Sequence, residues 1–554
     1  MAVTPTKQHY PTIIVGAGPA GLQLAYFLQR AGLDYLVLER APAAASFFDS
    51  YPHSGKLISI NKPHTGSDVY DFNLRHDWNS LLNDEKMSFT DYSKEYYPDK
   101  NDLVRYMNDY AKRFKLAISY NSVVQKISKG YTTGTADAPE GYTLRVSDLS
   151  GSTLYTCDKL VVATGLSKPQ MPEYIDNTTV KPKHYADYPK GYFQNPANLD
   201  TFRNKSLCII GNGNSAFELG NILTPYCSSI TIHGRKPKPW AASTHYTGDL
   251  RSVYLPFYDT FLLKSLNAMN NEVFRVLIDQ PSKQDLYKMS LICSPNCMVK
   301  HDFISSKTGF DHVIFATGWT FDTTPFEFEV PLTAHGKFPA IQSNYESVTH
   351  KNLFFIGALM HSLDYKASSG GFIHGFRYLI EYFFHLNYDK VVDTDIFSGT
   401  KSFESLIDHI LYKINYTSAM YQMYGVIGDV FFYNAAKKEF AYFNNVTKSF
   451  VNGLAKRYMN TKLFLIKLQY GDEPVTDIYK FGLKVSKLGT ESNSTLLHPV
   501  LYVMETPSKE GTSDQPPINL IDMIHFDEEI FAVYTDKVKY RDKLMRAIKG
   551  VVEK

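Results

Sequence analysis

The chain has 554 residues, of which 44% are hydrophobic and 21% are charged. This is the usual composition of a globular protein, and it argues against fibrous and disordered classes. Lysine and arginine (58) outnumber aspartate and glutamate (56) by two, and a net charge of only +2 argues against a dedicated nucleic-acid binder.

The cysteines and the apolar runs indicate the compartment in which the protein functions. Its five cysteines form no disulfide framework, which fits a reducing compartment. Residues 1–11 lack the apolar stretch of a secretory signal, and no run approaches the ~18 apolar residues of a membrane-spanning helix. We therefore expect a cytoplasmic protein without a membrane span.

The N-terminal residues have the pattern of a dinucleotide-binding unit. Residues 11–38 predict a buried strand, a helix and a second strand, and the loop after the first strand carries Gly16, Gly18 and Gly21. Gly16 permits the tight turn, Gly18 lets the backbone approach a pyrophosphate, and Gly21 lets the helix pack on the strand. Glu39 ends the second strand, where its carboxylate can accept hydrogen bonds from a ribose. This unit predicts bound FAD.

A second unit of the same kind covers residues 206–235. Its fingerprint has alanine, Ala216, in the third glycine position, and its second strand ends in Arg235 instead of an acid. An arginine there can pair with a 2′-phosphate, so this unit predicts NADPH. The residues expected to bind it are Gly211, Gly213, Asn214, Ser215 and Arg235.

Two later apolar strands, 160–165 and 313–318, each end in Ala-Thr-Gly, and a third, 353–356, precedes the glycine-rich residues 368–375. This order predicts an α/β fold with two Rossmann-like domains, the NADPH domain inserted in the FAD domain, plus a C-terminal α+β extension. We expect the FAD-binding domain at 1–198 and 326–394, the NADPH-binding domain at 199–325 and the extension at 395–554. The cofactor contacts predicted from the Ala-Thr-Gly turns are Thr164, Gly165 and Gly318.

Further residues are expected beside the flavin. Gly371 opens a helix whose N-terminal dipole can stabilise negative charge on a reduced ring. Asp364 is placed to hold the ribityl chain, and Arg75 and Trp78 lie in the loop expected on the flavin side.

Three residues are predicted to be catalytic. Lys264 lies in an apolar stretch, where desolvation would lower its proton affinity and let it hold or polarise a hypohalous acid; the alternative is an ordinary surface lysine. His245 and Arg251 follow the NADPH unit at a domain crevice, as ligand-binding residues or as members of an interdomain hydrogen-bond network. No cluster has metal-ligand spacing, so we expect no metal.

Two dinucleotides on one chain imply that electrons pass from nicotinamide to flavin. The reduced flavin could then reduce a disulfide, pass electrons to a partner or meet oxygen. A disulfide reductase needs a Cys-x-x-Cys pair, whereas Cys293 and Cys297 have three residues between them. Oxygen chemistry is therefore preferred.

The two glycine motifs with their Ala-Thr-Gly strands resemble those of the class B flavin-dependent monooxygenases. That resemblance implies FAD and NADPH on one chain and a flavin C4a-hydroperoxide that waits for substrate. Only His184 and Tyr188 match the linker motif of that class, which argues against simple N-oxidation or Baeyer–Villiger oxidation.

Longer strings resemble the family of FAD-dependent oxidoreductase domain-containing flavoproteins associated with degradation in the endoplasmic reticulum. They lie at residues 70–78, 244–251, 259–266, 370–378, 421–425 and 498–502. This arrangement of domains also resembles that of the single-component flavin-dependent halogenases.

These resemblances imply a monooxygenase or halogenase that uses FAD, NADPH and O2 on a small electron-rich aromatic such as a phenol or indole, with bromide or chloride as the halide. The alternatives are an NADPH-dependent reductase of a thiol, quinone or protein partner, and a flavin-bearing scaffold in protein degradation.

Overall fold

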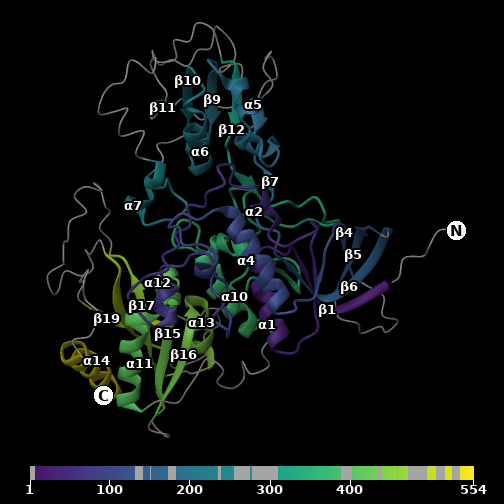
Figure 1. Ribbon diagram of the computed structural model, residues 1–554. Coiled ribbons are helices and arrows are strands. Elements are labelled where there is room, and N and C mark those ends of the chain that lie inside the picture. Colours follow the sequence, from purple (N-terminus) through teal and green to yellow (C-terminus); the bar gives the residue numbers. More distant parts are fainter. Residues whose placement is uncertain are drawn as a thin grey trace, which may run out of the picture.

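The computed structural model describes thirteen stretches of the chain, and three large β-sheets organise them (Figure 1). The described residues are 7–130, 141–149, 151–171, 182–234, 239–254, 275–277, 310–388, 402–434, 439–457, 460–471, 496–506, 518–526 and 537–553. The α/β prediction with two Rossmann-like cores is confirmed.

The first sheet has the order β3-β2-β1-β6-β5-β4, with β14 also paired to β6. Its strands are β1 (Lys7–Val15), β2 (Leu36–Leu38), β3 (Ile118–Ser119), β4 (Val123–Lys129), β5 (Tyr142–Asp148), β6 (Gly151–Val162) and β14 (Leu353–Phe355). The long strand β6 pairs antiparallel with β5 through its first half and parallel with β14 through its end. Since β1, β2, β6 and β14 run parallel, the loops after all four strands meet at one edge.

Helices cover this sheet and line its carboxyl edge. They are α1 (Pro19–Arg30), α2 (Ser46–Ser50), α3 (Tyr70–Asn73), α4 (Lys100–Arg113) and α10 (Ile373–Tyr388), with a 3₁₀ turn, η7 (Gly357–Ser362), after β14. Both α1 and α10 bury most of their residues and pack against each other, because their apolar side chains recur at helical spacing.

The second sheet is parallel and has the order β11-β10-β9-β12-β8. Its strands are β8 (Lys183–His184), β9 (Ser206–Ile210), β10 (Ser229–His233), β11 (Arg275–Leu277) and β12 (His312–Phe315), accompanied by α5 (Pro196–Leu199), α6 (Asn214–Leu223) and α7 (Ala241–Thr244). A short ribbon of β7 (Lys168–Pro169) and β13 (Trp319–Thr320) joins the segments entering and leaving it. The NADPH-binding domain was predicted to begin at residue 199. Strand β8 lies before that boundary, yet it pairs with β12 of this second sheet.

The third sheet belongs to the C-terminal extension and is antiparallel, in the order β16-β15-β17-β18-β19. Its strands are β15 (Ile427–Asn434), β16 (Glu439–Thr447), β17 (Lys462–Gln469), β18 (His498–Glu505) and β19 (Asn519–His525), with helices α11 (Phe403–Tyr416), α12 (Ala419–Gln422), α13 (Lys448–Arg457) and α14 (Lys537–Val552).

Alternating side chains of this third sheet enter two different cores. In β15, Val430 and Phe432 join the large core of the FAD domain, whereas Phe431 joins a separate core with α11 and α14. Leu465 and Phe464 of β17 divide in the same way. A period of two along a strand sends successive side chains to opposite faces, so the extension shares one core with the FAD domain instead of hanging from it.

Arg377, a fully buried residue of α10, holds the loop of residues 74–80 in place. Arg377 donates hydrogen bonds from Nη1 to the carbonyls of Asp77 (3.0 Å) and Ser80 (2.8 Å) and from Nη2 to that of Leu74 (2.7 Å). Trp78 lies in this loop, so its position depends on α10.

Replacing Arg377 should therefore destabilise the fold strongly. Arg377→Met keeps the length of the side chain but leaves the buried carbonyls of Asp77 and Ser80 without this donor and that of Leu74 with only a 3.5 Å hydrogen bond from Gln422. We expect a loss of about 3 kcal/mol. Thermal unfolding followed by circular dichroism measures it. Arg105→Met removes an exposed ion pair to Asp102 and an exposed hydrogen bond to the Tyr92 carbonyl; it is the control and should lower the midpoint little. If both substitutions lowered the unfolding midpoint equally, Arg377 would not be what holds the 74–80 loop in place.

Candidate functional site

The FAD-side glycine loop is held by close backbone contact. Gly16 has a φ of +106°, and a Cβ built there would lie 2.9 Å from the carbonyl oxygen of Ala163. A Cβ on Gly21 would lie 1.9 Å from the carbonyl oxygen of Gly16. These two glycines are required by the fold itself, because no side chain fits at either position.

Gly18 has a different environment. It is the N-cap of α1, no side chain caps the helix there, and nothing lies within 4 Å of a Cβ built on it. The first-turn N–H groups of α1 therefore face space that an anion can occupy, and the helix dipole favours negative charge at that point. This geometry fits the pyrophosphate of FAD.

Glu39 follows β2 at the same edge and is 4% exposed. Its carboxylate accepts hydrogen bonds from the backbone N–H of Ala17 (2.7 Å) and Ala41 (3.0 Å) and from the hydroxyl of Ser46 (3.2 Å). A carboxylate accepts about four, so Glu39 keeps capacity for a ribose hydroxyl. Its place fits the predicted role.

The NADPH-side loop repeats this geometry. Gly211 has a φ of +114°, and its Cβ would lie 2.2 Å from the carbonyl oxygen of Ala316, while nothing lies within 4 Å of a Cβ on Gly213. Gly213 is the uncapped N-terminus of α6, so this loop fits a second pyrophosphate. The glycines of the two Ala-Thr-Gly turns, Gly165 (φ +64°) and Gly318 (φ +86°), adopt the left-handed conformation beside the two loops.

Asn214 and Ser215 begin α6. The Asn214 side chain forms hydrogen bonds with the segment that follows α7. Its Nδ2 donates to the carbonyl of Asp249 (3.0 Å), and its Oδ1 accepts from the backbone N–H of Arg251 (2.9 Å). The fingerprint loop therefore positions the segment that carries two predicted catalytic residues. The other predicted residues of this domain, Arg235 and Lys264, lie outside the described residues.

Residues from three distant segments meet between the two nucleotide loops. The indole of Trp78 stacks on the imidazole of His374 with 4.2 Å between ring centroids, and the guanidinium of Arg251 lies 5.1 Å from the Trp78 ring. Arg251 also donates from Nη1 to the carbonyl of Ile58 (2.8 Å). Burial lowers the pKa of Arg251, and this interdomain contact gives the residue a structural role beside any catalytic one.

His374 was not singled out by sequence reasoning. It is 1% exposed on α10, and its Nε2 has no hydrogen-bond partner in the structure. Burial, followed by the nearby charges of Arg377 and Arg251, holds the pKa of His374 well below its ordinary value, so the imidazole is neutral. The sequence feature that could have identified His374 was its position three residues after Gly371, where a helix was predicted to begin.

His245 and Arg75 make their described contacts with the C-terminal extension. The ring of His245 stacks on Tyr470 at 3.8 Å, and its carbonyl accepts a hydrogen bond from the hydroxyl of Tyr424 (2.6 Å). Arg75 donates to the carbonyls of Thr417 (2.8 Å) and Ile414 (3.2 Å). Neither contact favours the predicted catalytic or cofactor role, although both roles stay predictions.

Asp364 has partners that the ribityl prediction did not include. Its Oδ1 bonds to Nδ1 of His361 (2.9 Å), and its Oδ2 accepts from the backbone N–H of Gly370 (2.8 Å). A Cβ on Gly371 would lie 2.7 Å from the His361 ring, so this glycine makes room for the imidazole. His361 was missed, although a histidine three residues before a predicted site aspartate was a signal.

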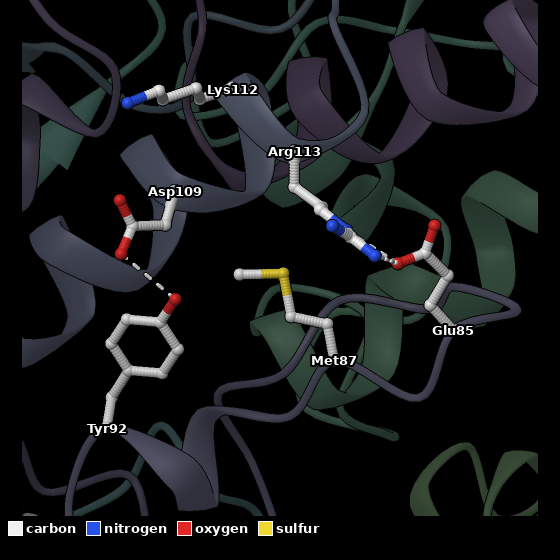
Figure 2. Close-up of a pocket in the computed structure, with 6 residues that line it drawn as sticks. All are labelled: Glu85, Met87, Tyr92, Asp109, Lys112 and Arg113. Atoms are coloured by element: carbon white, nitrogen blue, oxygen red, sulfur yellow. Dashed lines mark hydrogen bonds and ion pairs between the residues drawn. The ribbon is translucent and has the colours of Figure 1, made fainter.

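A hollow in the FAD domain contains none of the predicted residues (Figure 2). Its lining is Glu85, Met87, Tyr92, Asp109, Lys112 and Arg113. Opposite charges there pair with each other, as Arg113 does with Glu85 at 2.7 Å. Within the described ranges, no three His, Cys, Asp or Glu side chains gather in a group that could hold a metal.

The sequence profile of the pyridine nucleotide-disulphide oxidoreductases matches residues 13–357, which span both glycine loops. The chain belongs to this oxidoreductase family. A Mus musculus protein named FAD-dependent oxidoreductase domain-containing protein 2 is 32% identical over 525 residues, covering 90% of this chain and 76% of that protein. Its Danio rerio namesake is 31% identical over 546 residues, covering 91% and 77%.

A third relative of this oxidoreductase is a probable indole-3-pyruvate monooxygenase of Arabidopsis thaliana, YUCCA1. It is 25% identical over 347 residues, covering 55% of this chain and 75% of the plant protein. Family membership confirms the predicted resemblance and the prediction of an FAD-dependent oxidoreductase that uses a pyridine nucleotide. In the described part of the chain, no helix has the length and apolarity needed to cross a membrane.

Gly18 and Gly21 of the first glycine loop allow a test that separates cofactor binding from folding. Gly18→Val should fold, because its Cβ meets nothing within 4 Å, but the purified protein should be colourless, because the side chain occupies the pyrophosphate's place. Gly21→Val should fail to fold, since its Cβ would collide with the Gly16 carbonyl. Absorbance at the flavin band and thermal unfolding measure both. A yellow Gly18→Val protein would refute the assignment.

Proposed function

We propose that this chain is a single-component monooxygenase that oxygenates or halogenates an electron-rich aromatic such as a phenol or indole. For oxygenation the balance is NADPH + H⁺ + O2 + RH → NADP⁺ + ROH + H2O. The observation that carries the proposal is the repeated loop geometry, with Gly18 and Gly213 each open at the start of a helix on one polypeptide. Bound FAD supplies a ring system that accepts hydride from NADPH and, once reduced, reacts with O2.

The residues of the chain have separable tasks in this scheme. Gly18 and the α1 N-terminus hold one pyrophosphate, Glu39 orients its ribose, and Gly213 with α6 holds the second dinucleotide. The stacked rings of Trp78 and His374 lie at the domain boundary, where flat rings suit an aromatic substrate.

Oxygen as the electron acceptor is supported by the plant relative, whose name describes a monooxygenase of an indole compound. Halogenation with bromide or chloride is the finer part of the proposal and derives from the resemblance of the architecture. The cytoplasmic setting is likewise proposed, and the low cysteine content supports it.

The family description makes a disulfide reductase the second candidate. A redox-active thiol must be accessible and ionisable. Cys157 and Cys208 are buried, and burial raises the pKa of the Cys227 thiol to about 12, so these three are poor nucleophiles. Cys293 and Cys297 lie outside the described residues, and NADPH-dependent disulfide reduction that a Cys293→Ser/Cys297→Ser variant loses would favour this candidate.

Arg235 should determine the choice between the two nicotinamide cofactors. Arg235→Ala removes the cation expected at the 2′-phosphate, so KM for NADPH should rise about tenfold or more while KM for NADH changes little. Steady-state oxidation of both cofactors measures this. Arg203→Ala, in an exposed ion pair with Asp200 of the same domain, is the control. Equal effects of Arg235→Ala on both cofactors would remove Arg235 from the site.

Anaerobic reduction followed by mixing with O2, with and without bromide, tests the proposed reaction. NADPH should bleach the flavin absorbance, O2 should restore it, and mass spectrometry should detect hydroxylated or brominated products from a phenol and indole panel.

Lys264→Ala should oxidise NADPH normally but lose product and release H2O2. Flavin that NADPH does not bleach would favour the scaffold alternative, and reoxidation without product from any substrate would contradict the monooxygenase.

A further inference from the structure

A chain of buried hydrogen bonds crosses the boundary between the inserted domain and the FAD domain. The hydroxyl of Tyr246 lies 2.8 Å from Nε2 of His361, and Nδ1 of His361 lies 2.9 Å from Oδ1 of Asp364. Asp364 accepts a further hydrogen bond of 2.8 Å at Oδ2 from the backbone N–H of Gly370. Tyr246, His361 and Asp364 are 6%, 4% and 5% exposed, so all three side chains are buried.

The direction of this chain is assigned from its partners. In the assigned arrangement, Asp364 accepts the hydrogen bond and Nδ1 of His361 carries the proton. A neutral imidazole then has an acceptor at Nε2, which requires the Tyr246 hydroxyl to donate. This is the order of a carboxylate, an imidazole and a hydroxyl group in which the imidazole is ready to accept a proton.

The surrounding backbone holds the three side chains in place. A Cβ on Gly370 would lie 2.4 Å from Oδ1 of Asp364, and one on Gly248 would lie 2.7 Å from the Tyr246 hydroxyl oxygen. The loop of Tyr246 is closed by a 2.8 Å hydrogen bond from the Thr244 hydroxyl to Asp249. Such support from the neighbouring residues is what an acid–base group needs to keep its geometry.

We propose that Tyr246 is a catalytic base for the hydroxyl of a phenolic substrate, with His361 as its proton acceptor and Asp364 as the positioning carboxylate. This inference rests on the proposed function and narrows its substrate class to phenols. The substrate O–H bond breaks and its proton forms a new O–H bond on Tyr246, whose own proton passes to Nε2 of His361. Two protons move, the net result is the transfer of one proton from the substrate to His361, and no electrons are exchanged. The phenolate ring is richer in electrons, which favours attack by electrophilic oxygen or halogen.

Several titratable and charged groups face this chain from the packed elements. Around Tyr246 these are Tyr365 and Asp364 of the FAD domain, Asp249 of its own loop and Tyr424 of the extension, while Lys337 lies 5.0 Å from the Tyr365 ring. Burial, before these neighbouring charges, raises the pKa of Tyr246. Tyr246 therefore rests as a neutral phenol, and it acts by passing a proton on to His361 instead of by ionising alone.

Tyr246→Phe keeps the aromatic packing and removes only the hydroxyl. With FAD-loaded enzyme, product formation from a phenol should fall about 100-fold or more, while product formation from its O-methyl ether should stay at the wild-type rate. Tyr365→Phe, in the same ring cluster, is the matched control and should match the wild type.

Binding of 4-nitrophenol without turnover gives a second readout. The oxidised holoenzyme should bind it as the yellow phenolate at pH values below its solution pKa, and Tyr246→Phe should bind it as the neutral phenol. Equal spectra, absence of binding, or equal loss of activity on phenol and ether would overturn the base role. A wild type that makes no product from any aromatic, yet binds the phenolate only when Tyr246 is present, would refute the monooxygenase and leave the base in place.

Discussion

The close approach of a glycine loop to the carbonyl of an Ala-Thr-Gly turn is the constraint on which the rest of the structure depends. It occurs twice, where Gly16 lies against Ala163 and where Gly211 lies against Ala316. In each case a left-handed glycine brings the strand end, the turn and the helix N-terminus within contact distance. The following glycine is left uncovered, so the same geometry that packs the sheet also exposes the helix N-terminus to an anion.

The region between the two loops is assembled from segments distant in sequence. Arg251 comes from the inserted domain, Trp78 from the loop after α3, and His374 from α10. The buried Arg377 joins that loop to α10, while Tyr246 and His361 join the inserted domain to the turn after β14. A shift of one domain against the other would therefore break buried hydrogen bonds, which have a high free-energy cost.

The C-terminal extension is part of this assembly. One face of its sheet enters the core of the FAD domain, and Tyr470 and Tyr424 hold His245 at the end of α7. The extension thereby supports the chain directly before Tyr246. Its described contacts reach the inserted domain's loop at His245 and the FAD domain at Arg75.

The nucleotide-binding loops, the α/β class, the inserted arrangement and the cofactors were predictable from the sequence, because glycine spacing and apolar periodicity reflect short-range requirements on the backbone. Only the tertiary structure decided that Asn214 would bond to the Asp249–Arg251 segment, that Arg75 would face the extension, and that His361 would join Tyr246 to Asp364. These contacts join residues far apart in the chain. Their partners depend on how whole sheets pack, which no local pattern encodes.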